Sequence, residues 1–213
     1  MAIDQDSSTR KVILTMLKTK GPLSVNEMAK QLGITEMAVR RHLNTLERDT
    51  LISSILVRQA MGRPSHNYSL TPLAQDMFPK NYHTLTLDLL EELDEQDGTD
   101  LVGKLFDSRK KKLIHKYKDR MDSDDLTKRV SALADIQNAG GYMVEWEEDA
   151  SGNYVFQEYN CPISQVANKY NHACQCELSL FQTLLDTDVV RTECLANGGK
   201  KCVYLIKGKH DKP

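Results

Sequence analysis

Two short amphipathic segments joined at a glycine constrain the fold of this chain more than any other feature. Ser24 precedes the first segment, residues 25–32, whose apolar residues recur at helical spacing. Gly33 interrupts the pattern, and Thr35 precedes a second helical segment that continues to Arg48. Two helices joined by a short turn with glycine at the bend are typical of a helix-turn-helix.

A helix before this pair and a hairpin after it would complete a winged helix. Apolar residues at helical spacing predict the earlier helix, which the Gly-Pro pair at residues 21–22 ends. Residues 51–59 are rich in Ile, Leu and Val and predict a strand, residues 61–65 a turn, and residues 66–70 a returning strand. We therefore expect a winged helix-turn-helix domain over residues 1–71.

The second helix of the pair divides into an apolar and a polar side. The apolar side, expected to pack on the other helices, consists of Ala38, Val39, Leu43 and Leu46. The opposite side, expected to enter the major groove of DNA, consists of Met37, Arg40, Arg41 and Asn44. Arginine binds guanine edges or phosphates, and asparagine pairs with adenine.

Two further groups are candidate contacts to DNA phosphates. Thr35 and the amino-terminus of its helix can hold a phosphate. Arg63 follows Gly62 and precedes Pro64, so it projects from a stiff turn toward the adjacent minor groove or its phosphates. The charge distribution agrees, because residues 1–71 hold ten Lys+Arg against six Asp+Glu, whereas the remainder holds 18 against 24.

All five cysteines lie in the last quarter of the chain, at Cys161, Cys174, Cys176, Cys194 and Cys202. An odd number of cysteines argues against a disulfide framework and favours metal binding or redox chemistry. Their spacing differs from the paired knuckles of zinc fingers and ribbons. Widely spaced thiolates that converge from separate elements suit an iron–sulfur cluster.

The remaining sequence predicts an α+β protein with three parts. Residues 72–121 read as a helical linker and dimerisation segment, in which the basic run 109–112 is a solvated helix face, and residues 122–213 read as an α/β sensor domain. The elements expected in the sensor domain are helices at 126–138, about 163–170 and 176–185, strands at 142–147 and 154–159, and a closing hairpin of 189–194 with 201–206.

Several classes of protein are disfavoured. No apolar run is long enough to span a membrane, and the amino-terminus lacks the pattern of a secretory signal, so we expect a cytoplasmic protein. A nucleophile elbow, a phosphate loop and a carboxylate–histidine constellation are all missing from the sequence, so we do not expect an enzyme.

The chain resembles the SufR-type regulators, which repress iron–sulfur cluster assembly genes and are related to the DeoR and ArsR groups. The segments LGITEMAVRRHLNTLERDTLI and GRPSHNYSLT carry the resemblance in the amino-terminal part. In the carboxy-terminal part, 12 residues separate Cys161 from Cys174 and 27 separate Cys174 from Cys202, as in the cluster-binding pattern of that family. The resemblance is strongest over residues 24–72 and 160–206.

The resemblance implies a homodimer that binds a palindromic DNA operator and holds one [4Fe-4S] cluster per protomer. It implies Cys161, Cys174 and Cys202 as ligands, and it leaves the fourth ligand open. Cys194 is the nearest candidate, Cys176 is the alternative, and His172 or a small thiol are further options. The resemblance also implies that the cluster-loaded form represses transcription.

Three other functions remain open on sequence grounds. The first is a winged-helix regulator whose sensor binds zinc or forms a disulfide among Cys174, Cys176, Cys194 and Cys202. The second is a regulator whose carboxy-terminal domain takes an apolar effector. The third is an iron–sulfur enzyme in which three cysteine ligands leave one iron open to substrate.

Overall fold

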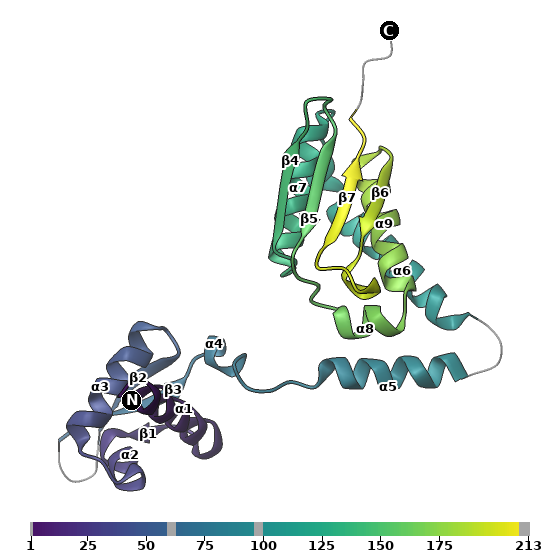
Figure 1. Cartoon of the computed structure of the whole chain (residues 1–213). Helices are drawn as coiled ribbons and strands as arrows, with labels where there is room; N and C mark the ends of the chain where they lie inside the picture. The colour runs from purple at the N-terminus through teal and green to yellow at the C-terminus, as the bar shows by residue number, and fades with distance from the viewer. Residues whose placement is uncertain (1, 59–62, 96–99, 209–213) are drawn as a thin grey trace. The chain divides into compact units, whose positions relative to one another are not determined.

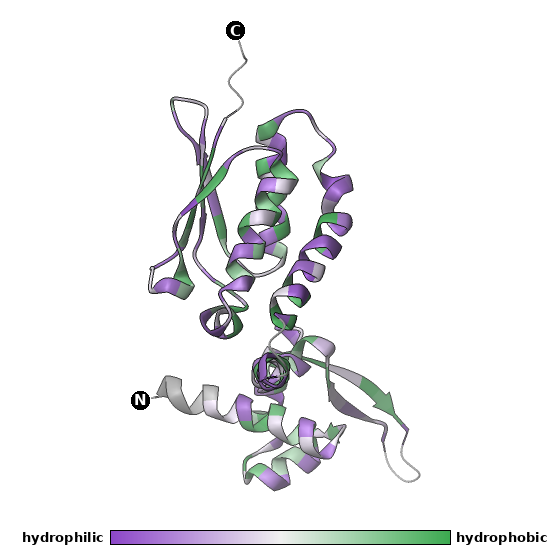
Figure 2. Cartoon of the chain, turned by 90° about the vertical axis from the view of Figure 1, so that its right-hand side faces the viewer, coloured by the Kyte–Doolittle hydropathy of each residue, from purple (hydrophilic) through white to green (hydrophobic). Residues whose placement is uncertain are grey.

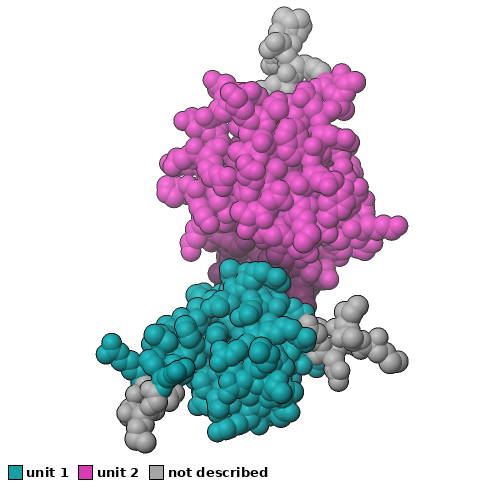
Figure 3. Space-filling model, turned by 90° about the vertical axis from the view of Figure 1, so that its left-hand side faces the viewer, with its two compact units in different colours: residues 1–80 teal, residues 81–213 magenta. Residues whose placement is uncertain are grey.

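The chain divides into two compact units, Met1–Lys80 and Asn81–Pro213 (Figure 3). The structure is a computed structural model, and it describes residues 2–58, 63–95 and 100–208, with side chains from residue 8 onward. No helix within these residues is both long and apolar enough to cross a lipid bilayer.

The first unit consists of helices that pack on a small sheet (Figure 1). Its elements are α1 (Ala2–Lys20), β1 (Leu23–Ser24), α2 (Val25–Leu32), α3 (Glu36–Arg48), β2 (Ile52–Val57), β3 (Ser65–Leu70) and α4 (Pro72–Gln75). The strands are antiparallel in the order β1-β3-β2. Helix α2 begins and ends where the sequence predicts, because Ser24 caps its amino-terminus and Gly33 adopts the left-handed conformation after its last residue.

The core of the first unit joins the three main helices to the sheet. Ile13, Met28, Val39 and Leu43 have no exposed surface, and Ala74 of α4 is equally buried. Burial of these side chains is the main stabilising contribution to the unit. Because α4 adds to this core, it belongs to the winged-helix unit.

Replacing Ser24 with alanine should lower the free energy of unfolding by about 0.5–2 kcal/mol. The Ser24 hydroxyl accepts a hydrogen bond from the Glu27 amide, and the Glu27 carboxylate accepts from the Ser24 amide at 2.7 Å. Hydrogen bonds from Ser24 lower the pKa of Glu27. The stabilisation from this carboxylate is therefore present above the unfolded-state pKa and is lost as the pH falls through the lower folded-state value.

Urea unfolding of the wild-type protein, Ser24→Ala and the control Ser53→Ala, at neutral and acidic pH, measures this effect. The difference between wild type and Ser24→Ala should shrink in acid. A difference that grows in acid, or that equals the effect of the control, contradicts the capping argument. Ser53 is an exposed residue of β2 and serves as the matched position.

The second unit is built around a four-stranded antiparallel sheet in the order β4-β5-β7-β6. Its elements are α5 (Tyr82–Glu95), α6 (Leu101–Tyr117), η1 (Lys118–Met121), α7 (Leu126–Ala139), β4 (Val144–Glu148), β5 (Tyr154–Glu158), α8 (Ser164–Lys169), α9 (His172–Leu185), β6 (Val189–Glu193), η2 (Leu195–Asn197) and β7 (Cys202–Ile206). Helices α7 and α9 cover one face of the sheet (Figure 1).

The core of the second unit lies between the sheet and these helices. Phe156, Phe181 and Tyr204 form a cluster of rings with centroids 4.8–6.3 Å apart. Helix α6 packs on α9 and adds Val102 and Phe106 to the same core. Figure 2 shows the stripes of hydrophobic and hydrophilic residues along the helices beside the sheet, as expected where one side of a helix is buried.

The structure confirms the mixed helix and sheet fold, with the winged helix first and the sheet domain second. Each predicted element of the sensor domain is present within a few residues of its expected bounds. The boundaries differ for residues 72–121, predicted as a separate linker, because α4 joins the first core and α6 joins the second. Residues 59–62, which include part of the predicted wing turn, lie outside the described residues.

Candidate nucleic-acid interface and thiol site

Helix α3 presents the side chains that the sequence assigns to DNA on its exposed side. Met37 is 78% exposed, and three polar residues are exposed beside it. These residues are Arg40, Arg41 and Asn44. Val39, Leu43 and Leu46 are buried on the opposite side, as predicted, and Ala38 is half-buried. The exposure of these residues is therefore as expected, whereas their contacts with DNA stay a prediction.

His42 is the residue of α3 that the sequence analysis missed. It is buried, and it lies three residues after Val39 and four before Leu46, so it occupies the packed side of the helix. The helical period of the apolar residues already places position 42 on this side. A histidine here contributes to packing and is not available to a DNA base.

The start of α3 is fixed by Thr35, whose hydroxyl oxygen accepts a hydrogen bond from the Ala38 amide at 3.2 Å. Within the first turn, the Arg40 guanidinium lies 3.6 Å from the Glu36 carboxylate, and both side chains are about half exposed. An exposed pair of this kind is weak, so Arg40 can exchange this partner for a phosphate or a base. Arg63 is exposed just before β3, beside the undescribed part of the wing.

Four cysteines from separate elements converge in the second unit. Cys161 precedes α8, Cys174 lies in the first turn of α9, and Cys194 and Cys202 flank the turn between β6 and β7. The Cys174 and Cys194 sulfur atoms are 3.9 Å apart, and the Leu195 amide donates a hydrogen bond to the Cys202 sulfur at 3.4 Å. Helix α8, which follows Cys161, packs on η2, which follows Cys194, and Cys174, Cys194 and Cys202 are buried in the same core.

Cys176 points away from this set. It follows Cys174 by two residues on α9, a rotation of about 200° around the helix. Its thiol instead donates to the Asp107 carboxylate of α6 at 3.7 Å. His172 is also directed elsewhere, because its Nε2 lies 3.8 Å from the Asp100 carboxylate and its side chain is 48% exposed. Among these candidates, the Cys194 sulfur contacts the Cys174 sulfur, and the identity of the fourth ligand stays a prediction.

Burial raises the pKa of three of these thiols, Cys161, Cys174 and Cys202. It raises the pKa of Cys161 to about 11. It raises the pKa of Cys174 and of Cys202 to about 12, and the neighbouring Cys194 adds to the effect at Cys174. Neutral thiols are poor ligands and poor nucleophiles, so a metal that binds here must displace protons.

A buried polar network adjoins the thiols. The Glu158 carboxylate is 1% exposed and accepts a hydrogen bond from the Gln137 amide at 2.8 Å. The Tyr204 hydroxyl donates to the Glu177 carboxylate at 3.0 Å. Burial raises the pKa of both carboxyl groups, and the charge of Glu177 raises that of Glu158 further. The site therefore combines sulfur donors with acids that resist ionisation.

The sequence analysis did not identify this network, although signals for it exist. Strand β5 alternates, and Glu158 falls on the same side as the buried Phe156. Glu177 follows Cys174 by three residues and therefore lies on the same side of α9. Arg191 was also missed. Its guanidinium donates to the Cys174 carbonyl at 2.7 Å and so fixes the start of α9 against β6.

The donor set fits an iron–sulfur cluster. All five cysteines are free, so none of the four thiols is held in a disulfide. Within the described residues, no three His, Cys, Asp or Glu side chains are arranged to hold a single metal ion. A cluster does not require that arrangement, because each of its irons takes its own cysteine. The fit rests on two observations, namely that the donors are cysteine thiols and that they lie on adjoining segments of the unit.

A family model described as a helix-turn-helix domain matches residues 6–55. These residues cover most of α1, all of α2 and α3, and the first part of β2. Among the curated proteins compared with this chain, none matches. The family match therefore concerns the first unit alone.

Several solved structures are similar to this chain at low TM-scores. ZitR of Lactococcus lactis, a zinc-responsive MarR family member, is 27% identical over 52% of this chain and 75% of its own, with a TM-score of 0.30. AdcR of Streptococcus pyogenes is 18% identical over 54% and 80%, with a TM-score of 0.30. PadR of Bacillus subtilis, solved with operator DNA, is 16% identical over 80% and 95%, with a TM-score of 0.29.

The assignment of the first unit rests on its own topology and on the family match. Three helices, a two-strand wing and an exposed basic side of α3 stand in the order that a winged helix requires. The amino-terminal unit is a winged helix-turn-helix domain, the fold of DNA-binding transcriptional regulators.

Proposed function

We propose that this protein is a DNA-binding transcriptional regulator whose second unit senses iron–sulfur cluster status. The observation that carries the proposal is the contact between the Cys174 and Cys194 sulfurs, with Cys202 and Cys161 on adjoining segments, in a chain that also contains a winged helix. The cofactor would be a [4Fe-4S] cluster, held by these four thiolates. Cys176 is left out of this proposed ligand set because its thiol donates a hydrogen bond to the Asp107 carboxylate instead.

The protein residues prepare the site in two ways. Apolar neighbours limit the access of water, since Cys174, Cys194 and Cys202 are each about 5–6% exposed. The Leu195 amide donates to the Cys202 sulfur, and hydrogen bonds to ligand sulfurs raise the reduction potential of a bound cluster. The cluster, when bound, supplies sensitivity to oxidants and to the supply of iron and sulfide.

The proposed regulatory change is mechanical. The four cysteines belong to the segment before α8, to α9 and to the hairpin of β6 and β7. Ligation of all four ties these segments into one body, and loss of the ligation frees them to move separately. In a homodimer this change would alter the distance between two α3 helices on a palindromic operator.

The resemblance to the SufR-type regulators supports the finer assignments. We infer from it a cytoplasmic homodimer that represses genes of iron–sulfur cluster assembly or related genes when the cluster is present. Arg40, Arg41 and Asn44 would contact the major groove together with Met37. Thr35 and Arg63 would contact phosphates or the adjacent minor groove.

Purification of the full chain without oxygen tests the proposal. The protein should be brown, with a broad absorbance band at about 400–420 nm and about four irons and four sulfides per chain. Brief exposure to air should bleach the band and change the affinity of the protein for a DNA duplex that it selects from a random pool. A colourless, iron-free protein whose DNA affinity is unchanged by air contradicts the proposal.

A thiol–disulfide switch is the second candidate, and the 3.9 Å separation of the Cys174 and Cys194 sulfurs favours it. A disulfide would require these atoms to approach to about 2.05 Å. Its formation removes two protons and two electrons from the pair, and a peroxide would accept both and be reduced to water. A colourless protein in which peroxide joins Cys174 to Cys194, detected by mass spectrometry of peptides, would favour this candidate over the cluster.

A further inference from the structure

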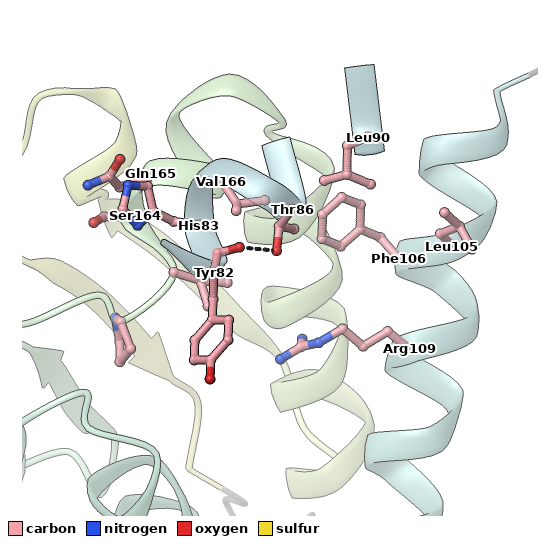
Figure 4. A pocket seen from close by; sticks show the side chains of 12 residues that line it. Tyr82, His83, Thr86, Leu90, Leu105, Phe106, Arg109, Ser164, Gln165 and Val166 are labelled. Carbon is pink, nitrogen blue, oxygen red and sulfur yellow. Dashed lines mark hydrogen bonds between the residues drawn. The ribbon is translucent and has the colours of Figure 1, made fainter. Parts of the chain in front are cut away.

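A pocket within the second unit lies beside the thiol site and plays no part in the proposed function. Its volume is about 540 Å³, within the range of roughly 300–1,000 Å³ that is usual for small-molecule sites. Helices α5 and α6 and the segment Pro162–Val166 form its walls (Figure 4). Leu90, Leu105, Phe106 and Val166 give it a mainly apolar lining.

Arg109 gives this pocket a positive charge. Figure 4 shows its side chain extending from α6 toward Tyr82. No acidic residue lines the pocket, and within the described part of the chain the Arg109 side chain makes no ion pair or hydrogen bond. The adjacent Lys110, in contrast, lies 3.0 Å from the Asp107 carboxylate and donates to Ser179. A cation without a partner at the edge of an apolar pocket complements an anion that has an apolar body.

The walls of the pocket are held together by contacts outside it. The Lys169 ammonium lies 2.8 Å from the Glu91 carboxylate and joins α8 to α5. Phe106 is 9% exposed and joins α6 to the core. The pocket is therefore formed by packed elements of one unit.

We infer that this pocket binds a small amphipathic carboxylate. The carboxylate would pair with the Arg109 guanidinium, and its aliphatic body would lie against Leu90, Leu105 and Val166. The pocket wall begins at Pro162, one residue after Cys161, so a bound ligand contacts the segment that carries one of the proposed cluster ligands. Binding itself does not depend on the cluster and can be tested without it.

Isothermal titration of the full chain with decanoate, and with 1-decanol as its uncharged counterpart, tests the inference. Decanoate should bind once per chain with a Kd of roughly 100 µM. Decanol should bind about tenfold more weakly, because it cannot pair with Arg109. The variant Arg109→Gln should lose this preference, whereas Lys111→Gln, an exposed position of the same helix outside the pocket, should keep it.

A variant in which a large side chain fills the pocket provides a second test. Thr86→Trp places a large ring in the pocket and should abolish decanoate binding, whereas Thr84→Trp, on the exposed side of α5, should not. Circular dichroism and thermal unfolding establish that each variant folds. Equal binding of decanoate and decanol, or binding that survives Thr86→Trp, overturns the inference. A wild-type protein that binds no decanoate and that changes from dimer to monomer with Thr86→Trp would assign the pocket to a second copy of the chain instead.

Discussion

Cys194→Ser should purify without oxygen carrying fewer than about one iron per chain, whereas Cys176→Ser should keep about four. The two positions carry the same side chain, but the two thiols have different neighbours. The Cys194 sulfur contacts the Cys174 sulfur at 3.9 Å, whereas the Cys176 thiol donates to Asp107 at 3.7 Å. Removing a ligand from the set is therefore expected only at Cys194.

The visible spectrum and the iron and sulfide contents of both variants measure this difference. Cys161→Ser, Cys174→Ser and Cys202→Ser should each behave like Cys194→Ser. Cys176→Ser is the matched control, because it changes the same atom outside the converging set. Loss of iron in Cys176→Ser with full iron in Cys194→Ser would show that α9 turns on binding and that the ligand set proposed here is wrong.

Replacing Arg40 and Arg41 together with alanine should weaken specific DNA binding by about 100- to 1,000-fold. Each good arginine contact to a base or its phosphate contributes about 1–3 kcal/mol, and the two side chains are adjacent on the exposed side of α3. The core of the first unit should be unaffected, because Val39, Leu43 and Leu46 pack on the other side of the helix. Anisotropy titration of a labelled duplex measures the change.

Lys118→Ala combined with Arg120→Ala removes the same charge from η1 of the second unit and serves as the control. Equal losses in both double variants would indicate a nonspecific effect of net charge and would contradict the role assigned to α3. The single variants separate the two arginines further. A base contact should relax sequence preference at one position, whereas a phosphate contact should weaken binding to all sequences and reduce the salt dependence by about one ion.

The sequence predicts the winged helix well because its boundaries depend on local chemistry. Ser24 and Thr35 can accept hydrogen bonds from free amides at the starts of α2 and α3, and Gly33 can adopt the left-handed conformation between them. These residue types can be recognised directly in the amino-acid sequence. The exposed side of α3 follows from the helical period in the same way.

The spacing of the cysteines in the sequence does not decide which one is the fourth ligand, and it does not predict the polar network. Both depend on how distant segments pack together. Cys174 and Cys176 lie almost opposite each other on α9, yet only the neighbouring elements decide which side faces β6 and which faces α6. The burial of Glu158 and the partial burial of Glu177 likewise depend on how β5 and α9 meet. Long-range packing of this kind is not specified by periodicity alone.

The order of the strands has a consequence for the resistance of the protein to aggregation. Strands β4 and β6 lie at the two ends of the described sheet, where backbone groups are available to pair with another chain. Glu145, Glu147 and Glu148 place negative charge along β4, and the register of β6 shifts between Arg191 and Glu193. Both features oppose edge-to-edge aggregation, so we expect the sheet to resist pairing with other chains even when the packing around it loosens.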